Sequence, residues 1–338
     1  MSKTDLLSPW VRRFLLEYLV VEKNRSRNTQ KSYRDTLLQF LPFIARSARR
    51  RLAQLQVEDI TPARTRAFLL DVENTRGCGI ATRNQRLAAI QSLADFISQY
   101  SPEHIQWRGQ IQTVVAKKTT SKLPDYLEKD ELDALLGAPD RRTAQGRRDY
   151  AILLFMYNTG ARADEVAHVQ IADLNLGSRP GRDLSSVRIH GKGNKIRHCP
   201  VWDNTAAELV HLIGNRAASE RVFLNRYGRP LTRSGIHTLV ERHAAKAAMK
   251  LPSMTKKRVS PHTIRHTTAT HLACAGVDIN TIRGWMGHVS IATTNIYAQI
   301  SLAMKAKALA ACEIQDGKTK KQKSWRHNKG LMAFLKTL

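Results

Sequence analysis

The chain has 338 residues, of which 55 are Lys or Arg and 28 are Asp or Glu, so its formal net charge is +27 at pH 7. Apolar residues make up 42% and charged residues 25%, a composition typical of folded proteins that excludes a wholly disordered chain. The length predicts two domains. The positive charge is spread over the whole sequence and predicts a polyanionic partner such as nucleic acid.

The sequence shows no sign of a membrane-spanning segment or of a metal-binding site. No run approaches the roughly 18 apolar residues that a membrane helix needs, and the N-terminus lacks an apolar signal core. We therefore expect a cytoplasmic protein with no membrane contact. The four cysteines are widely separated, and His262, His266 and His271 lack the partner ligands that zinc requires. We expect neither a disulfide framework nor a metal site.

The first part of the chain is predicted to be a small helical bundle. Apolar residues recur at helical spacing in three segments, 11–19, 33–44 and 87–97. Thr61-Pro62 is a favourable start for a fourth helix over 61–72. Basic residues precede several of these segments, and helix N-termini also attract phosphates. We expect residues 1–115 to form a DNA-binding domain. The candidates for contacts with the DNA backbone are Arg25, Arg27, Arg83 and Arg86.

A basic linker and a mixed domain are predicted next. Residues 116–124 have linker composition, and Lys117 and Lys118 are candidates to lie along the nucleic acid. In the domain predicted over 125–312, strands at 184–190 and 195–201 are joined by a turn at 191–194. Residues 313–338 are predicted to be a basic tail. Helices of the mixed domain are predicted at 128–136, 145–158, 204–213, 232–248, 261–275 and 278–286.

Two motifs of the mixed domain place arginines where a phosphate could bind. Arg162 follows the helix break at Gly160, and Glu165 can hold it while its other N–H groups face a phosphate. The alternative is a surface ion pair. His262 and Arg265 follow a favourable helix start and share one face beside the positive helix end. For the neighbouring His266 we favour a packed, structural role over a catalytic one.

Two further motifs offer a proton donor and a nucleophile. Lys192 stands between glycines in the predicted turn, where its amine can protonate a leaving oxygen. Lys195 competes for this role and is the better candidate for a plain DNA-backbone contact, and a solvated turn lysine is the alternative. Tyr297 follows Gly287 and His288; its phenol can attack phosphorus if cations stabilise the oxyanion. Taken alone, Tyr297 is better explained as a core or surface aromatic residue.

In this order the motifs resemble the tyrosine recombinase (phage integrase) family. The resemblance rests on Thr159-Gly160-Ala161-Arg162 with Glu165, Gly191-Lys192-Gly193, His262-Thr263-Ile264-Arg265-His266, Gly287-His288 and Tyr297. It covers nearly the whole chain and implies a mainly α fold with a small β-sheet. That fold would consist of an N-terminal helical bundle (a SAM-like core-binding domain) and an α+β catalytic domain. Two positions depart from the family pattern: Ile264 replaces the usual leucine, and Gln299 a common histidine.

The resemblance also implies roles for the residues. Arg162, Arg265 and His288 would hold the scissile phosphate, and Tyr297 would attack it to leave a 3′-phosphotyrosine and a free 5′-hydroxyl. Lys192 would protonate the leaving oxygen and His262 would assist proton transfer at the tyrosine. Glu165 would be a supporting residue that orients these groups. Because the covalent link conserves the phosphodiester energy, we expect no cofactor and no metal.

Family members act as four protomers on two duplexes. We therefore expect a homotetramer on double-stranded DNA with specific recombination sites, with residues 301–312 docking on a neighbouring protomer. The role that we favour is that of an integrase or transposase of a mobile element, in the cytoplasm at the nucleoid. The alternatives are an Xer-like chromosome-dimer resolvase, a topoisomerase-like nicking and closing enzyme, and a non-catalytic DNA-binding regulator.

Overall fold

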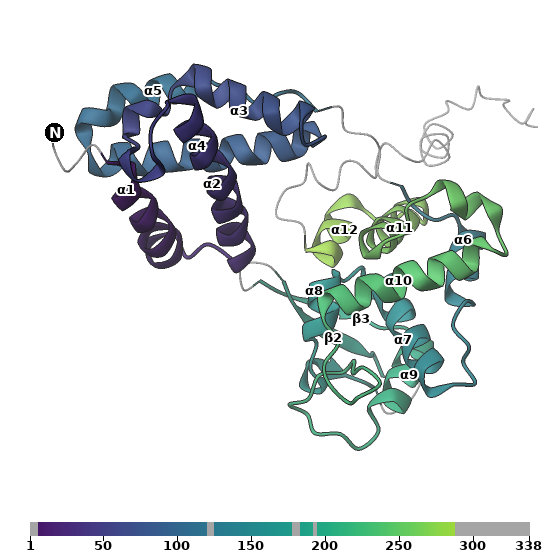
Figure 1. Ribbon diagram of the computed structural model, residues 1–338. Helices are drawn as coiled ribbons and strands as arrows, with labels where there is room; N and C mark the ends of the chain where they lie inside the picture. Colours follow the sequence, from purple (N-terminus) through teal and green to yellow (C-terminus); the bar gives the residue numbers. More distant parts are fainter. Residues whose placement is uncertain (1–5, 120–124, 178–182, 192–194, 288–338) are drawn as a thin grey trace, which may run out of the picture. The chain divides into compact units, whose positions relative to one another are not determined.

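The computed structural model describes residues 6–119, 125–177, 183–191 and 195–287 (Figure 1). The chain divides into two compact units, Met1–Ser121 and Lys122–Leu338. This division falls inside the segment 116–124 that the sequence predicts as a linker. The mainly α fold with a small β-sheet, which the sequence predicts, is confirmed.

Helices build the first unit. Their starts follow from local sequence: the Ser26 hydroxyl accepts a hydrogen bond from the backbone N–H of Thr29, and the Thr61 hydroxyl accepts one from Arg64 ahead of Pro62. All four predicted helical segments are present. The elements are α1 (Leu7–Arg13), the π-helical η1 (Phe14–Glu22), α2 (Arg27–Ser47), η2 (Leu52–Gln54), η3 (Val57–Asp59), α3 (Pro62–Asn74), α4 (Ile80–Tyr100), η4 (Pro102–His104) and α5 (Ile105–Gln112).

Two features of this unit differ from the prediction. The first predicted helix, 11–19, is divided between α1 and η1, whose wider turn places Phe14, Tyr18 and Leu19 together in the core. Helix α5 is not predicted. It buries only Trp107 and Ile111, too few apolar residues to give a recognisable period. The indole N–H of Trp107 donates to the backbone carbonyl of Ile60 over 2.7 Å, which fastens α5 to the start of α3.

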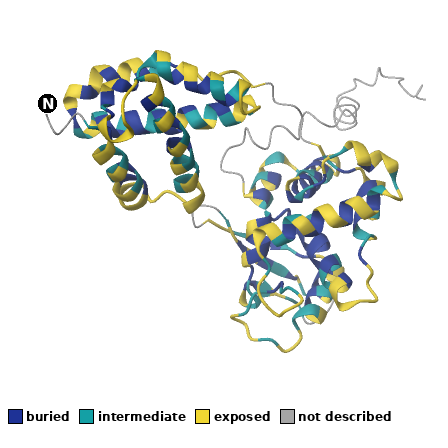
Figure 2. Cartoon of the chain, in the orientation of Figure 1, coloured by how far each residue is buried: buried dark blue, intermediate teal, exposed yellow. Residues whose placement is uncertain are grey.

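The core of the first unit is rich in aromatic side chains. The rings of Phe40 on α2 and Phe68 on α3 meet edge to face with centroids 5.0 Å apart. Tyr18 and Phe96 place their rings 4.8 Å apart and so join η1 to α4. Figure 2 shows the residues coloured as buried along the inner faces of these helices. The helices therefore have a single shared core that fixes α2 against α4.

Helices and a three-stranded sheet build the second unit. The sheet is antiparallel in the order β1-β2-β3, and Ile189 pairs with Arg197 in its register. The predicted helices and both predicted strands are confirmed, whereas the short elements α8 and β1 are not predicted. The elements are α6 (Lys129–Leu136), α7 (Ala144–Thr159), α8 (Ala163–His168), η5 (Ile171–Asp173), β1 (Leu174–Asn175), β2 (Ser186–His190), β3 (Ile196–Pro200), α9 (Asp203–Ile213), α10 (Arg233–Ala248), η6 (Pro252–Lys256), α11 (Pro261–Cys274) and α12 (Ile279–Met286).

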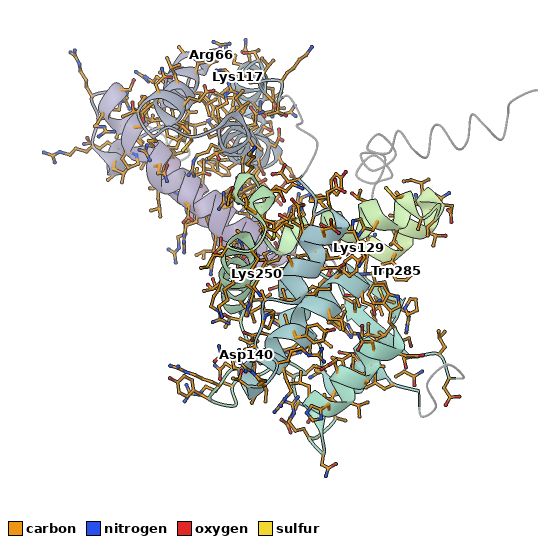
Figure 3. All side chains as sticks on the ribbon, turned by 90° about the vertical axis from the view of Figure 1, so that its right-hand side faces the viewer. Arg66, Lys117, Lys129, Asp140, Lys250 and Trp285 are labelled. Carbon is orange, nitrogen blue, oxygen red and sulfur yellow. The ribbon has the colours of Figure 1, made fainter. Side chains whose placement is uncertain are left out.

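Helix α7 is the centre of this unit. Ile152, Phe155 and Met156 are fully buried along it, and they belong to the same core as Val187 and Ile189 of β2. A smaller apolar cluster joins α11 to α12, and the indole N–H of Trp285 (Figure 3) donates to the carbonyl of Asn158 on α7 over 3.2 Å. The C-terminal ends of α7 and α12 are thereby brought together.

Candidate active site

A left-handed turn after α7 places Arg162. Gly160 ends the helix with φ +61°, a conformation that favours glycine. Arg162 then becomes the N-cap residue of α8. Its backbone N–H donates to Glu165 Oε2 over 2.9 Å, and its Nη1 donates to Glu165 Oε1 over 2.8 Å. Glu165 therefore holds Arg162 as predicted, at the surface, where 38% of the Arg162 side chain is exposed.

Arg265 binds to the same turn from inside. Its helix, α11, begins as predicted, with Ser260 as N-cap and Pro261 in the first position. The Arg265 guanidinium donates from Nη1 to the carbonyl of Gly160 over 2.6 Å and from Nη2 to the carbonyl of Met286. Only 2% of Arg265 is exposed. Arg265 thus binds the turn that carries Arg162, although 103 positions of sequence separate the two arginines.

A third arginine, Arg197 on β3, completes the group around Glu165. Its Nη1 lies 3.1 Å from Glu165 Oε1 and its Nη2 lies 2.7 Å from Oε2, a bidentate pair. The sequence analysis missed this residue. The available signal was the strand alternation, since Arg197 is two residues before the buried Cys199 and both point inward.

The electrostatics of this group favour an ionised carboxylate. Burial of Glu165 opposes ionisation, but the hydrogen bonds and charge of Arg197, together with those of Arg162, outweigh it and lower the pKa of Glu165. Burial acts on Arg197 in the same opposing way, and the Glu165 carboxylate overcomes it to raise the pKa of Arg197. Two cations and one anion therefore stand together as charged groups.

Two glycines that directly precede predicted site residues in the sequence lie beside this group. A Cβ added to Gly191 would lie 3.4 Å from Glu165 Oε1, and one added to Gly287 would lie 3.2 Å from Arg197 Cδ. Gly191 directly precedes Lys192, and Gly287 directly precedes His288. Lys192, His288 and Tyr297 themselves lie outside the described residues, as do segment 301–312 and the predicted tail 313–338.

Lys195 ends the turn between β2 and β3. Its backbone carbonyl accepts a hydrogen bond from the N–H of Gly191 over 2.7 Å. This bond closes the predicted turn at its base. The Lys195 side chain is exposed, which suits the DNA-backbone contact that we prefer for it.

His262 and His266 form a pair on α11. Their ring centroids are 4.3 Å apart in an edge-to-face arrangement. The His262 ring is exposed, yet the surrounding protein and the charges of Arg265 and Arg162 lower its pKa. Burial, followed by the charges of His262 and Arg265, lowers the pKa of His266 to about 4. Both rings are therefore neutral at pH 7.

The predicted DNA-binding residues of the first unit fall into two groups. Arg25, Arg27 and Lys118 are exposed, with Arg25 and Arg27 beside the start of α2. Arg83 is 6% exposed, and its Nη1 donates to the carbonyl of Val115 over 2.8 Å. Lys117 is exposed but its Nζ lies 2.8 Å from a carboxylate oxygen of Glu73. Arg83 and Lys117 thus fasten residues 115–117 to α3 and α4.

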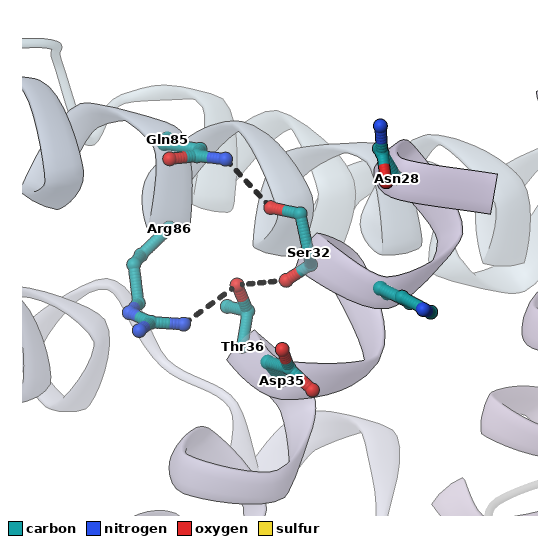
Figure 4. Close-up of a pocket in the computed structure, with 7 residues that line it drawn as sticks. Asn28, Ser32, Asp35, Thr36, Gln85 and Arg86 are labelled. Carbon is teal, nitrogen blue, oxygen red and sulfur yellow. Dashed lines mark hydrogen bonds between the residues drawn. The ribbon is translucent and has the colours of Figure 1, made fainter. Parts of the chain in front are cut away.

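Arg86 lines a polar pocket of about 300 Å³ between α2 and α4 (Figure 4). Its Nη1 donates to the Thr36 hydroxyl over 3.2 Å, and the Gln85 amide donates to the Ser32 hydroxyl over 2.7 Å. Lys31 and the acidic Asp35 also line the pocket. Polar side chains from two helices, one of them a carboxylate, therefore line one hollow in the first unit.

The described ranges contain neither a metal site nor a membrane-spanning helix. No group of three His, Cys, Asp or Glu side chains there is arranged to hold a metal ion. No helix in the same ranges is long and apolar enough to cross a membrane.

Comparisons with known proteins agree with this arrangement. Residues 125–303 match the phage integrase family and residues 12–99 match the phage integrase N-terminal SAM-like domain. A putative integrase/recombinase, y4rC of Sinorhizobium fredii, is 36% identical over 340 residues that cover 100% of both chains. Tyrosine recombinase XerD of Staphylococcus haemolyticus is 30% identical over 85% of this chain and 92% of its own.

A solved structure shares the fold. The Tn1549 transposon integrase in complex with a circular intermediate DNA superimposes with a TM-score of 0.64 at 19% identity, over 89% of this chain and 99% of that one. The fold and the comparisons together define an enzyme that cleaves and rejoins DNA strands. The chain belongs to the phage integrase family of tyrosine recombinases.

Proposed function

We propose that this chain is the integrase of a mobile element and recombines specific sites in double-stranded DNA, with Arg162 and Arg265 on the scissile phosphate. The supporting observation is the convergence at Glu165 and Gly160. Arg162 follows the Gly160 turn and is bound to Glu165, and Arg265 donates to the carbonyl of Gly160. A Cβ added to Gly191 or to Gly287, which precede Lys192 and His288 in the sequence, would lie 3.4 Å from Glu165 or 3.2 Å from Arg197. Residues from four of the five motifs thus approach one small region of the second unit.

The proposed reaction is an exchange of one phosphate ester for another. The phenolic oxygen of Tyr297 attacks phosphorus and forms a bond to it, while the bond from phosphorus to the 5′ oxygen breaks. The neutral His262 accepts the phenolic proton, and Lys192 gives a proton to the departing oxygen. Arg162, Arg265 and His288 stabilise the extra negative charge of the transition state. Attack by the 5′-hydroxyl of another strand reverses these steps, so no cofactor is needed.

The remainder of the chain is proposed to hold the DNA. Residues 1–115 form the helical DNA-binding domain, 116–124 the basic linker, 125–312 the catalytic domain and 313–338 the basic tail. Arg25, Arg27, Lys118 and Lys195 are proposed to contact backbone phosphates because they are exposed cations. Arg86 and the pocket between α2 and α4 are proposed to face the duplex. For Arg83 and Lys117 we propose the positioning of residues 115–117.

A covalent trapping experiment tests the catalytic proposal. Purified chain is mixed with a duplex carrying its recombination site and a nick beside the scissile phosphate, so that the released fragment diffuses away. The expected result is a covalent protein–DNA complex that survives denaturing gels. The variant Tyr297→Phe removes the nucleophile and is expected to bind DNA normally without forming the complex. A complex of undiminished yield in this variant would assign the nucleophile to another residue.

The assembly on DNA is proposed to be a homotetramer at the nucleoid in the cytoplasm. In it, residues 301–312 dock onto a neighbouring protomer. Sedimentation of the chain on paired recombination sites measures the number of protomers. A chain that ends at residue 300 is expected to bind single sites but to form no tetramer. Full assembly by that truncated chain contradicts the proposed docking.

An Xer-like chromosome-dimer resolvase is the second candidate. The observation that favours it is the 30% identity to tyrosine recombinase XerD over 85% of this chain. Sequencing of the DNA bound by this chain in its native cell separates the two roles. An integrase is expected at the ends of a mobile element, whereas a resolvase is expected at one fixed chromosomal position.

A further inference from the structure

Arg197 is a nearly buried cation for which the reaction described above has no use. Its side chain is 9% exposed, and that of its partner Glu165 is 4% exposed. The two guanidinium nitrogens Nη1 and Nη2 reach the two carboxylate oxygens over 3.1 and 2.7 Å. Lysine cannot reproduce this parallel pair of hydrogen bonds, because its ammonium is a single point of charge.

The Glu165 carboxylate serves two arginines that differ in exposure. Besides Arg197 it binds Arg162, through Nη1 at 2.8 Å and through the backbone N–H at 2.9 Å. The Arg162 side chain is 38% exposed and so faces the surface. If Arg162 were the only cation at this carboxylate, the pair would be electrically neutral. With Arg197 present, the three side chains carry one net positive charge.

The Arg197 side chain lies close to Gly191 and Gly287, the residues that precede Lys192 and His288 in the sequence. A Cβ on Gly287 would approach its Cδ to 3.2 Å and its Nη1 to 3.4 Å, and a Cβ on Gly191 would lie 3.6 Å from the same Nη1. Gly287 also has φ +63°, which favours glycine. Arg197 therefore belongs to the candidate site, close to both Gly191 and Gly287.

We propose that Arg197 is a positioning residue that neutralises Glu165 and thereby leaves the positive charge of Arg162 for the scissile phosphate. Glu165 can then orient Arg162 without cancelling its charge. The inference rests on the proposed function, in which Arg162 binds that phosphate. The inference adds to the proposed function that Arg197, on β3, balances the charge of Glu165. Strand β3 contributes no other residue to the proposed reaction.

The test compares two substrates that differ in charge. One nicked duplex carries the normal phosphodiester at the scissile position, and the other carries a methylphosphonate, in which a methyl group replaces a charged oxygen. A neutral phosphonate needs less positive charge in its transition state. The rate of covalent complex formation is measured for the unaltered chain, Arg197→Met, Arg197→Lys and the double variant Arg197→Met/Glu165→Gln. The matched control is Arg188→Met, because Arg188 on β2 also pairs with a buried acid, Asp173, over 3.0 Å.

The expected pattern is a substrate-dependent defect. Arg197→Met should slow the phosphodiester reaction by about 10-fold or more and the methylphosphonate reaction by at most about 3-fold. The Glu165→Gln substitution should restore part of the lost rate, because it removes the charge that Arg197 balances. Arg197→Lys should fall in between, and Arg188→Met should match the unaltered chain on both substrates. DNA affinity, measured in parallel, should change little in all variants.

Other outcomes overturn the inference. An equal defect on both substrates shows that Arg197 only maintains the fold, and an undiminished phosphodiester rate shows that it has no part in the reaction. If thermal melting shows that Arg197→Met is unfolded, the double variant and Arg197→Lys take its place. For each of them the rate on the phosphodiester is compared with the rate on the methylphosphonate. Failure of the unaltered chain to form a complex with the phosphodiester contradicts the proposed function instead, so the two failures are distinct.

Discussion

The guanidinium of Arg265 donates a hydrogen bond to the backbone carbonyl of Gly160, with an Nη1–O distance of 2.6 Å. Its Nη2 donates to the carbonyl of Met286. Gly160 ends α7 and Met286 is the last residue of α12, so one buried side chain joins the ends of two helices. The residue proposed to bind phosphate therefore also holds the local structure together.

This double role predicts that Arg265→Met lowers stability as well as activity. The substitution leaves two buried carbonyl oxygens without their donors, and we expect the free energy of unfolding to fall by about 2–4 kcal/mol. DNA cleavage should fall by about 100-fold or more. Urea unfolding and covalent trapping measure the two effects. The control is Arg283→Met on α12, which should leave stability within about 0.5 kcal/mol; an Arg265→Met variant as stable as the original chain would refute the structural role.

Gly160 and Gly284 are expected to respond in opposite directions to the same substitution. Gly160 has φ +61°, and an added Cβ would lie 2.5 Å from Met286 Cε and 2.8 Å from its Sδ. We expect Gly160→Ala to lower the free energy of unfolding by about 1–3 kcal/mol. Gly284 lies inside α12 with no atom within 4 Å of an added Cβ, so Gly284→Ala should be neutral or raise stability by up to about 1 kcal/mol. A similar loss in both variants would mean that the Gly160 turn is not strained by alanine.

The sequence predicted the helices and the order of the motifs because both depend on local patterns. Ser260 and Pro261 mark the start of α11 by their own chemistry, and Gly160 marks the end of α7. The placement of Arg162 beside Glu165 also follows from their spacing of three residues. These features need no knowledge of the rest of the chain.

The parts that were missed depend on contacts between distant segments. Arg197 pairs with Glu165 across 32 positions of sequence. The strand alternation shows only that Arg197 points inward, and no local pattern identifies Glu165 as its partner. The burial of Arg83 is similar, since its partner is the carbonyl of Val115, the residue just before the predicted linker. A basic residue ahead of a helix looks the same in sequence whether it faces solvent or closes a contact. Only the packed fold separates these two cases.

The pH dependence of the cleavage rate should reflect the protonation of His262. If this ring accepts the phenolic proton it must be neutral, and its lowered pKa extends the neutral range to more acidic solution. We expect the cleavage rate to fall with acidification only below pH 6.5, the ordinary pKa of a histidine. Single-turnover cleavage between pH 5 and pH 8 tests this. His262→Gln should lose most of the rate and, with it, the fall in rate at acidic pH. His237→Gln, at a partly exposed residue, should keep both the rate and its pH dependence. A limb above pH 6.5 would exclude His262 as the acceptor.

His266 should make stability depend on pH in a defined window. Its pKa falls from 6.5 to about 4 in the folded chain, so the unfolded chain binds the proton more readily between these values. The stabilising contribution is present above pH 6.5 and is lost as the pH falls toward 4. For one buried ring the loss is up to about 3 kcal/mol. In urea unfolding at several pH values, the free energy of unfolding should depend less steeply on pH for His266→Asn than for the original chain. Parallel curves would mean that another group is responsible.

The exposed and buried arginines of the first unit should differ in their effect on DNA binding. Arg25 and Arg27 are exposed at the start of α2, and each is expected to displace about one counterion from a phosphate. The double variant Arg25→Gln/Arg27→Gln should therefore bind more weakly and reduce the slope of log K against log salt by about 2. Arg83→Gln removes a charge as well, but Arg83 is 6% exposed and is bound to Val115. Its slope should stay unchanged, and protease cleavage near residue 115 should become faster. Fluorescence anisotropy over a range of salt concentrations measures all three chains; an equal loss of slope in Arg83→Gln would place that arginine on the DNA after all.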